Sequence, residues 1–295
     1  MANYSIKDLE RLTGIKAHTI RIWEKRYNLI EPERTSTNIR AYCDDELKKL
    51  LNISILNKNG YKISKIANLT SDEIADSINK LTASSTDTIS QIESLAIAMI
   101  DIDEARFEKI LSRSIIQIGF EDTVNRILRP FLVKIGLMWQ TGSINPAQEH
   151  FVSNLVRQKM LVAIDSQITG NLPNSKNFTL FLPEGEMHEF GLLFANYLLR
   201  KRGHNVVYLG QNVPLDDLIE IERIRPSDYM LTSFITSFTD CDLMGYLYQL
   251  QDRCPGKKVF VTGEQAAKFS NSLGKNVRYI DSPESLLTEL DGIPS

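Results

Sequence analysis

The sequence predicts a multidomain fold that is α-helical in its first two parts and α/β in its third. Two short helical patterns separated by a glycine turn open the chain, and four longer amphipathic patterns follow. Five apolar segments then alternate with helical ones. We therefore expect a winged helix-turn-helix head, a four-helix bundle, and a flavodoxin-like sheet of five parallel strands with flanking helices.

The expected domain boundaries follow the local composition. Residues 1–75 form the head, residues 90–170 the bundle and residues 178–295 the α/β domain. The stretches between them, 76–89 and 171–177, are rich in small and polar residues. Such composition is typical of linkers, and the first is expected to be flexible or weakly helical.

The composition is that of a globular protein without a membrane segment. The chain has 295 residues, of which 42% are hydrophobic and 24% charged. No apolar run reaches the ~18 residues that cross a membrane, and the N-terminus lacks the layout of a signal peptide. We therefore expect a cytoplasmic protein with no membrane partner. Cys43, Cys241 and Cys254 are odd in number and far apart, which argues against disulfides and a thiolate zinc site.

Charge is distributed unevenly along the chain. Residues 1–69 contain 13 Lys or Arg against 8 Asp or Glu, a net charge of +5. The remainder contains 21 against 29, a net charge of −8. Because basic regions attract phosphate groups, only the N-terminal part has the charge expected of a nucleic-acid-binding surface.

The first two helices are expected to form a helix-turn-helix. Ser5 stands at the N-cap position before apolar residues at helical spacing, and Gly14 ends this helix after about two turns. A second helix begins almost at once, with Trp23 and Tyr27 on its apolar stripe. We assign both aromatic residues to the core. Two short helices joined by a tight glycine turn are typical of this motif.

A β-hairpin wing is expected after the second helix. Residues 29–42 are too polar and too interrupted by proline for a helix, and Arg34 and Arg40 flank the tip. Asp44 is expected to cap a longer helix that ends at Lys58, and residues 64–69 give one more short helix.

The motifs of this head closely resemble the winged DNA-binding domain of MerR-type regulators, over about 70 residues. The matching residues are Thr13-Gly14-Ile15, His18-Thr19-Ile20-Arg21-x-Trp23-Glu24-x-Arg26-Tyr27, Pro32-x-Arg34, Asn38, Arg40-x-Tyr42 and Gly60-Tyr61-x-Ile63. The resemblance implies that the second helix enters the major groove and that the wing contacts the DNA backbone or groove edge. The implied DNA-binding residues are His18, Thr19, Arg21, Arg34, Arg40 and Tyr42. The alternative is that half of them are only solvated side chains.

Four amphipathic helical patterns predict the bundle. They cover residues 89–100, 103–118, 120–140 and 145–169, with apolar residues at steps of three and four. Short connections between such helices are typical of a four-helix bundle. Pro130 lies inside the third pattern and is expected to kink or divide that helix.

The bundle also contains Trp139, which is followed by nine residues and then by Glu149-His150. This spacing resembles the cobalamin-capping bundle of one branch of the MerR family, which includes light-sensing carotenoid-gene repressors that use adenosylcobalamin. The resemblance implies that the bundle covers the upper face of the corrin and that the tryptophan packs against the upper ligand. The alternative is that Trp139 fills the core and that Glu149 and His150 are first-turn residues of a helix.

The third part predicts a parallel, doubly wound sheet. Its strands are expected at residues 178–182, 206–209, 229–234, 258–261 and 277–280. Because loops that follow parallel strands meet at one edge of the sheet, we expect four of them to converge. They contain His188, Gly210-Gln211-Asn212, Ser233 and Gly263-Glu264.

Residues in these loops resemble the cobalamin-binding domain of methionine synthase and the methylmalonyl mutases. That signature is aspartate-x-histidine-x-x-glycine, then serine-x-leucine, then a glycine pair. Here the chain has Glu186-x-His188-x-x-Gly191, Ser233-x-Ile235 and Gly263-Glu264. The resemblance implies that His188 binds cobalt from below, that Glu186 accepts the other histidine N–H, and that the nucleotide tail passes close to Gly191.

The chain departs from these patterns at four positions. Glu186 replaces aspartate and Ile235 replaces leucine, which are mild changes. Glu264 replaces the second glycine, and its carboxylate is expected to intrude into a narrow buried slot for the tail. Gln140 stands where light-responsive members often carry a histidine after the tryptophan, so the light response is open.

The expected function is a DNA-binding transcriptional regulator, a repressor, whose oligomerisation and operator binding are controlled by cobalamin. Adenosylcobalamin is the expected cofactor, and the partners are double-stranded operator DNA and further copies of the chain, as a dimer or tetramer. No paired carboxylates, nucleophile elbow or phosphate loop indicate an enzyme. Two alternatives stay open. One is a cobalamin-independent regulator whose α/β domain binds proteins, and the other is a cobalamin-dependent methyl carrier.

Overall fold

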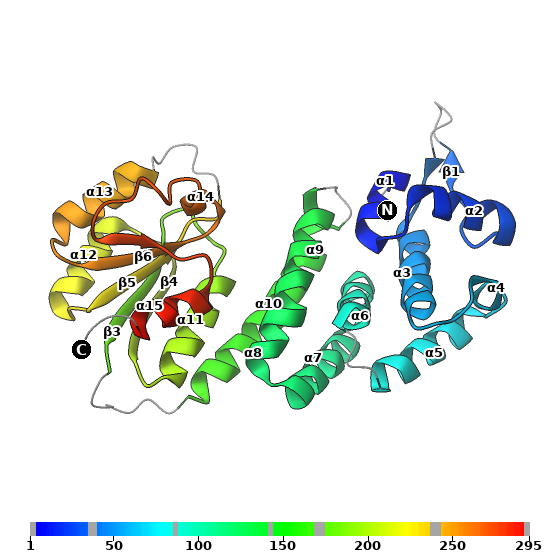
Figure 1. Cartoon of the computed structure of the whole chain (residues 1–295), viewed down its shortest axis with the longest axis horizontal. Helices are drawn as coiled ribbons and strands as arrows, with labels where there is room; N and C mark the ends of the chain where they lie inside the picture. The colour runs from blue at the N-terminus through cyan, green and yellow to red at the C-terminus, as the bar shows by residue number, and fades with distance from the viewer. Residues whose placement is uncertain are drawn as a thin grey trace. The chain divides into compact units, whose positions relative to one another are not determined.

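The computed structural model describes residues 4–34, 40–84, 88–140, 144–167, 175–236 and 243–291. The chain forms two compact units, Met1–Leu155 and Val156–Ser295 (Figure 1). Helix α10, Pro146–Asp165, contains the division between them. Within the described residues, no helix is both long and apolar enough to cross a membrane.

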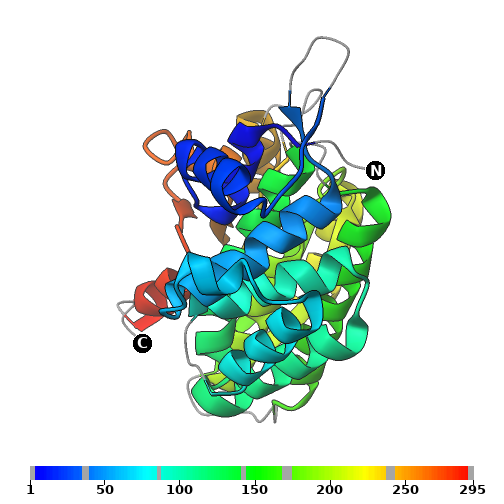
Figure 2. The ribbon, with the colours of Figure 1, turned by 90° about the vertical axis from the view of Figure 1, so that its right-hand side faces the viewer.

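The expected helix-turn-helix is present in the first unit. It consists of α1 (Ile6–Thr13) and α2 (Ala17–Tyr27), which lie beside the wing strands in Figure 2. Ser5 caps α1 by accepting a hydrogen bond from the backbone of Asp8, whose side chain accepts one in return. Gly14 ends α1 with φ 72°, a left-handed conformation that glycine adopts without strain. Trp23 is buried as predicted, whereas Tyr27 is only half-buried.

The wing is a pair of short antiparallel strands, β1 (Glu33–Arg34) and β2 (Arg40–Ala41). Its tip, which includes the motif residue Asn38, is outside the described residues. Two helices follow, α3 (Asp44–Lys58) and α4 (Ile63–Ile66). The predicted N-cap of α3 is wrong by one residue: Asp44 is already helical, and its carboxylate accepts a hydrogen bond of 2.7 Å from the Tyr4 hydroxyl.

Helix α5, Ser71–Ser84, occupies most of the stretch expected to be the first linker. Ile74 and Ile78 are four residues apart, both are buried, and α5 packs against α3. The small polar residues that suggested a linker lower helix propensity by only a few tenths of a kcal/mol each. Burial of two isoleucines exceeds that cost, so the segment is helical.

The helices of the middle part appear at the expected positions. They are α6 (Thr88–Ile100), α7 (Glu104–Ile118), α8 (Phe120–Thr123), the π-helical turn η1 (Val124–Leu128), α9 (Arg129–Gln140) and α10. The division of the third pattern is the break expected from Pro130. The ring of a proline clashes with the carbonyl four residues before it in a regular α-helix. The π turn widens the helix just before that point, with the Arg129 N–H bonded to the Val124 carbonyl.

The second unit contains the predicted five-stranded parallel sheet. Its strands are β3 (Asn177–Pro183), β4 (Asn205–Val213), β5 (Tyr229–Ser233), β6 (Lys258–Thr262) and β7 (Val277–Tyr279), in the order β4-β3-β5-β6-β7. This is the flavodoxin-like order. The helices are α11 (Phe190–Lys201), α12 (Leu215–Ile224), α13 (Leu243–Arg253), α14 (Glu264–Ala267) and α15 (Pro283–Asp291).

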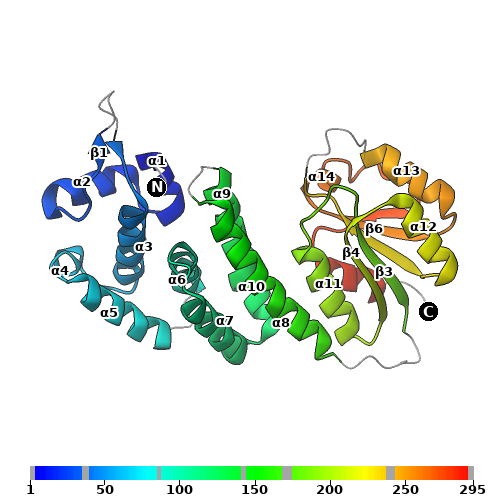
Figure 3. The same cartoon turned by 180° about the vertical axis from the view of Figure 1, so that it is seen from behind.

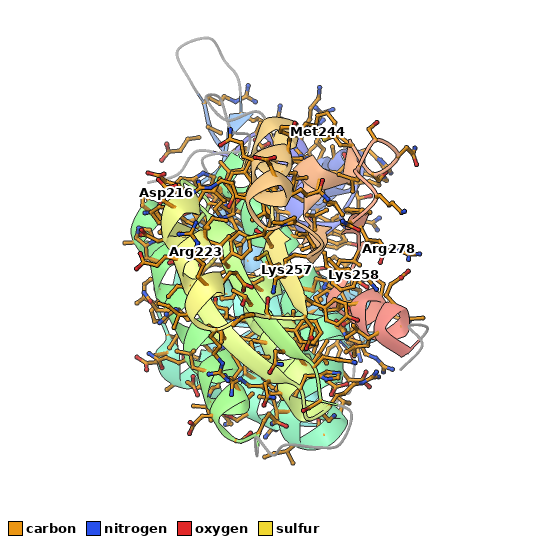
Figure 4. All side chains as sticks on the ribbon, turned by 90° about the vertical axis from the view of Figure 1, so that its left-hand side faces the viewer. Asp216, Arg223, Met244, Lys257, Lys258 and Arg278 are labelled. Atoms are coloured by element: carbon orange, nitrogen blue, oxygen red, sulfur yellow. The ribbon has the colours of Figure 1, made fainter. Side chains whose placement is uncertain are left out.

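Helices cover both faces of this sheet. Figure 3 shows α11 on one side of β3 and β4 and α12 on the other, and α11 packs against α15. The side chains of α12 and α13 join the strands in one apolar core, and Figure 4 labels Asp216 and Arg223 on α12 and Met244 on α13. The chain leaves β3 toward β4 and later returns to place β5 on the other side of β3. The carboxyl ends of β3 and β5 therefore flank the switch point, where α/β sheets bind ligands.

Candidate functional site

A buried carboxylate lies at the switch point of the sheet. Glu186, in the loop after β3, has an exposed fraction of 0%. Its Oε1 accepts hydrogen bonds from the backbone N–H groups of Met187 and His188, both at 2.9 Å. Its Oε2 accepts from the backbone N–H groups of Ile235 (2.8 Å) and Thr236 (2.7 Å), which follow β5. One side chain thus joins the two loops that flank the switch point.

These hydrogen bonds decide the charge of Glu186. Burial alone raises the pKa of a carboxyl group. Here the bonds donated by the His188 side chain and by the N–H groups of Thr236, His188 and Ile235 outweigh burial and lower the pKa of Glu186 to about 2. The carboxylate is therefore ionised at neutral pH and acts only as an acceptor.

The imidazole of His188 contacts this carboxylate and also faces solvent. Its Nδ1 lies 2.7 Å from Oε1 of Glu186 and 3.2 Å from the Thr236 hydroxyl, and 61% of the side chain is exposed. When Nδ1 carries the proton and donates it to Glu186, the lone pair lies on Nε2, at the other side of the ring. A carboxylate behind a histidine sets its tautomer and raises its basicity as a ligand. The contact expected between Glu186 and His188 is present.

Two residues near the carboxyl end of β4 fix the other side of the same loop. The Gln211 amide donates a hydrogen bond of 2.6 Å to the Met187 carbonyl, and Oδ1 of Asn212 accepts one of 2.8 Å from the Gly185 N–H. Gln211 and Asn212 therefore meet the His188 loop as expected, although they lie within β4 and not in a loop after it. Because backbone groups are bonded on both sides, the position of His188 is set by the fold.

The site also contains contacts that the sequence did not single out. Thr236 follows the Ser233-x-Ile235 pattern directly, so that pattern was the one signal that could have indicated it. Glu189 is buried next to His188 and contacts Arg157 of α10 and Tyr208 of β4. No spacing in the sequence relates these last three residues.

The two predicted glycines differ in what surrounds them. A Cβ at Gly191, in the first turn of α11, would meet no atom within 4 Å, so no protein neighbour requires glycine there. A Cβ at Gly263 would lie 2.3 Å from the carbonyl oxygen of Phe234, and Gly263 has φ +100°. Glycine is therefore needed where the loop after β6 approaches the end of β5, next to the buried Ser233.

The expectation that Glu264 intrudes into a narrow slot concerns the bound nucleotide tail, and it stays a prediction. Glu264 is the first residue of the one-turn helix α14, and its side chain is exposed. Ala266 of the same turn is the residue that packs into the core. An exposed carboxylate has no desolvation cost to be offset by a partner.

In the first unit, Trp139 lies on α9 with half of its surface, 50%, exposed. The alternative that it fills the core is therefore wrong. Glu149 and His150 are in the first turns of α10. The carboxylate of Glu149 is 2.5 Å from the Ser153 hydroxyl and 2.9 Å from Nδ1 of His150, which is largely exposed.

The predicted DNA-binding residues fall into two groups. His18, Arg21 and Arg34 are exposed and Thr19 is half-buried, as a recognition surface requires. Arg40 and Tyr42 instead meet at Glu24 of α2. Arg40 binds both carboxylate oxygens at 3.1–3.3 Å, and the Tyr42 hydroxyl lies 3.5 Å from Oε2 while only 1% of the residue is exposed. These two residues fix the wing against α2.

No group of three or more metal-binding side chains exists among the residues that the structure describes. A metal ion held by protein side chains alone needs such a group. One oriented imidazole suits a metal that arrives already bound in a macrocycle, because it then needs only an axial ligand. The donor set therefore fits a corrin cobalt better than a free ion.

Comparison with known proteins identifies the family. Residues 4–73 match the family of MerR HTH regulatory proteins, and residues 91–163, within the bundle, match the B12 binding domain. The chain is 30% identical over 272 residues to the HTH-type transcriptional repressor CarH of Myxococcus xanthus, with 89% of each chain covered. The protein belongs to this family of MerR-type transcriptional repressors.

Two further similarities concern the family and the fold, respectively. The HTH-type transcriptional repressor CarA of M. xanthus is 24% identical over 287 residues, which cover 96% of this chain and 94% of CarA. The solved monomethylamine corrinoid protein of Methanosarcina barkeri has a TM-score of 0.53 at 18% identity, covering 68% of this chain and 96% of that chain. This second likeness shows the fold alone. The predicted DNA-binding regulator with a cobalamin-binding part is confirmed.

Proposed function

We propose that this MerR-type repressor binds cobalamin with the lower face of the corrin at His188. The observation that carries the proposal is the contact between the buried Glu186 carboxylate and Nδ1 of His188, which directs Nε2 outward from the switch point of the sheet. The space around Gly191 and the exposed position of Glu264 leave room for a nucleotide tail.

The bundle is proposed to cover the upper face of the corrin. The half-exposed indole of Trp139 is the apolar surface available for the upper ligand, and Glu149 and His150 are the polar groups beside it in the motif. Adenosylcobalamin is the proposed form, and when bound it supplies a cobalt–carbon bond that light can break. Gln140 stands in place of a histidine after the tryptophan, so the proposed light response does not include a histidine at that position.

The head is proposed to bind operator DNA through α2 and the wing. The exposed His18, Arg21 and Arg34 and the half-buried Thr19 are the side chains available to the groove and phosphates. Arg40 and Tyr42 support this surface by holding Glu24. A two-fold operator requires at least two heads, so we propose a homodimer or homotetramer whose assembly depends on cobalamin. Cobalamin can shift that assembly only if it binds one arrangement more tightly than the other.

The relatives named above are transcriptional repressors, and we propose that this chain likewise regulates transcription in the cytoplasm and catalyses no reaction.

Absorbance spectroscopy tests the proposed cofactor and its ligand. The full-length protein is incubated in the dark with adenosylcobalamin, desalted, and compared with His188→Ala and with Glu184→Gln, an exposed carboxylate in the same loop. We expect a coloured wild type and Glu184→Gln variant with the same spectrum, and weaker or spectrally altered binding in His188→Ala. A colourless wild type would overturn cobalamin binding, and an unchanged His188→Ala spectrum would overturn the ligand assignment.

A gel-shift titration of the repressor with its operator then tests whether cobalamin controls operator binding. Cobalamin-loaded and cobalamin-free protein are expected to differ in operator affinity and in elution from a sizing column. Equal affinity and equal elution would contradict control by cobalamin while leaving cobalamin binding itself intact.

A further inference from the structure

Glu189 connects three elements of the second unit. It is the residue after His188 and the N-cap of α11. Its Oε1 accepts a hydrogen bond of 2.6 Å from Nε of Arg157 on α10, and its Oε2 accepts one of 2.8 Å from the Tyr208 hydroxyl on β4. Only 8% of the Glu189 side chain is exposed, whereas 49% of the Arg157 side chain is, so the carboxylate is buried and the guanidinium lies at the surface.

Such an arrangement is demanding in geometry. A buried carboxylate loses its hydration and needs partners at each oxygen, and charged hydrogen bonds at these lengths are strong. Because each oxygen of Glu189 has one partner from a different element, a displacement of the residue breaks at least one bond. Glu189 therefore cannot move independently of α10 and β4.

The first part of the loop is held by other elements. Its contacts are Gln211 and Asn212 of β4 and Ile235 and Thr236 after β5. Arg157 is a side chain of α10 that contacts the last residue of the His188 loop. The same continuous helix contains Glu149 and His150 eight and seven residues earlier.

We propose that Glu189 is a positioning residue that couples the His188 loop to α10, so that occupancy at His188 changes the stability of α10 through Arg157. This inference rests on the proposed binding of cobalamin at His188. Glu189 itself binds no cofactor atom in this proposal. Coupling of this kind requires that the ligand favour one of two positions of the His188 loop. The ion pair between Arg157 and Glu189 then makes the stability of α10 depend on the position that the loop adopts.

Hydrogen exchange of the full-length protein tests the coupling. Backbone amides of residues 157–165 are followed in free protein and after loading with adenosylcobalamin in the dark. In the wild type we expect loading to slow their exchange about fivefold or more, the lower end of ordinary coupling. In Arg157→Gln and Glu189→Gln we expect this effect to fall below about twofold, with cobalamin colour retained.

A matched control separates coupling from general loss of stability. Arg253 of α13 forms an arginine–carboxylate ion pair of 2.6 Å with Asp216, a residue of the same unit that Figure 4 labels. Arg253→Gln is expected to keep the full effect of cobalamin on residues 157–165. An unchanged effect in the folded Arg157→Gln variant, or an equal loss in Arg253→Gln, would overturn the proposal.

Two further measurements cover the remaining outcomes. If Arg157→Gln does not fold, Tyr208→Phe is used, because it removes the hydroxyl that donates to the same carboxylate. We expect this variant to reduce partly the effect of cobalamin on exchange of residues 157–165. A full effect in Tyr208→Phe would count against the proposal. If the wild type binds no cobalamin, the proposed function fails. The link is then tested in free protein, where Arg157→Gln should speed exchange of residues 190–193 about fivefold. Unchanged exchange there would overturn the link as well.

Discussion

Replacing Glu186 with glutamine is expected to destabilise the α/β unit in a pH-dependent way. The pKa of Glu186 falls from its ordinary value of 4.5 to about 2 in the folded protein. At about 1.4 kcal/mol per pH unit, this shift corresponds to roughly 3 kcal/mol of stability. Glutamine has nearly the same shape, but its NH₂ group would face backbone N–H donors and leave at least one of them without an acceptor.

The sign of the pH dependence follows from the lowered pKa. A carboxyl group that binds protons less tightly in the folded state stabilises that state above its unfolded pKa, and the contribution is lost as pH falls through the folded value. The wild type should therefore exceed Glu186→Gln by about 3 kcal/mol at pH 7 and by about 1.5 kcal/mol at pH 3. Near pH 2 most of the difference should be gone.

Hydrogen exchange of β3 and β5, corrected for the pH dependence of intrinsic exchange, measures this difference in the intact chain. The method reports each element separately, which matters because a chain with two compact units need not unfold in one step. Glu184→Gln, in the same loop but exposed, is the control and should stay within about 0.5 kcal/mol of the wild type. A Glu186→Gln variant as stable as the wild type at pH 7, or a difference constant between pH 5 and pH 3, would refute the reasoning.

Three other substitutions have defined expectations. Gly263→Ala should lower the free energy of unfolding by about 2 kcal/mol or more, because its Cβ would lie 2.3 Å from the Phe234 carbonyl oxygen at φ +100°. Thermal unfolding measures this loss, and Gly191→Ala should show no comparable loss. Arg21→Ala should weaken operator binding on the order of tenfold and make its salt dependence shallower by about one unit, which titrations at two salt concentrations would reveal. Lys134→Met should stabilise the first unit by about 3 kcal/mol at pH 7, since burial lowers the pKa of Lys134 from its ordinary value of 10.5 to about 8. That gain should vanish as pH rises from 8 toward 10.5, and a gain independent of pH in urea titrations would contradict it.

The strands were predictable because each is a short apolar run bounded by polar residues. The run at 178–182 differs from β3 by one residue at each end. The end of β4 was missed, since Gln211 and Asn212 are polar and are in the strand because they bond to the neighbouring loop. Helix α5 was missed for a related reason: the burial that stabilises Ile74 and Ile78 depends on α3, which local composition does not report.

The site was predictable only where its contacts are local. Glu186 and His188 are two residues apart, so a short motif captures their contact. Thr236 reaches the same carboxylate from fifty residues away, and Arg157 reaches Glu189 from thirty-two. Contacts between residues so far apart in the sequence produce no spacing pattern that a single sequence could show. Tyr42 shows a further limit of motifs, because a position typical of DNA contact is also packed against Glu24 and the motif does not indicate that packing. Its contact with DNA stays a prediction.

The π turn at Val124–Leu128 determines which side chains of α9 face the core. A π turn accommodates about one residue more per turn than an α turn, so the residues after it lag by one step of about 100°. With that lag, Phe131, Ile135 and Met138 all point into the core. A regular helix of the same sequence would rotate Met138 outward to the angle now held by Trp139. The extra residue before Pro130 thus keeps Met138 in the core, and it places the indole of Trp139 beside the core-facing side of α9, where half of it is exposed.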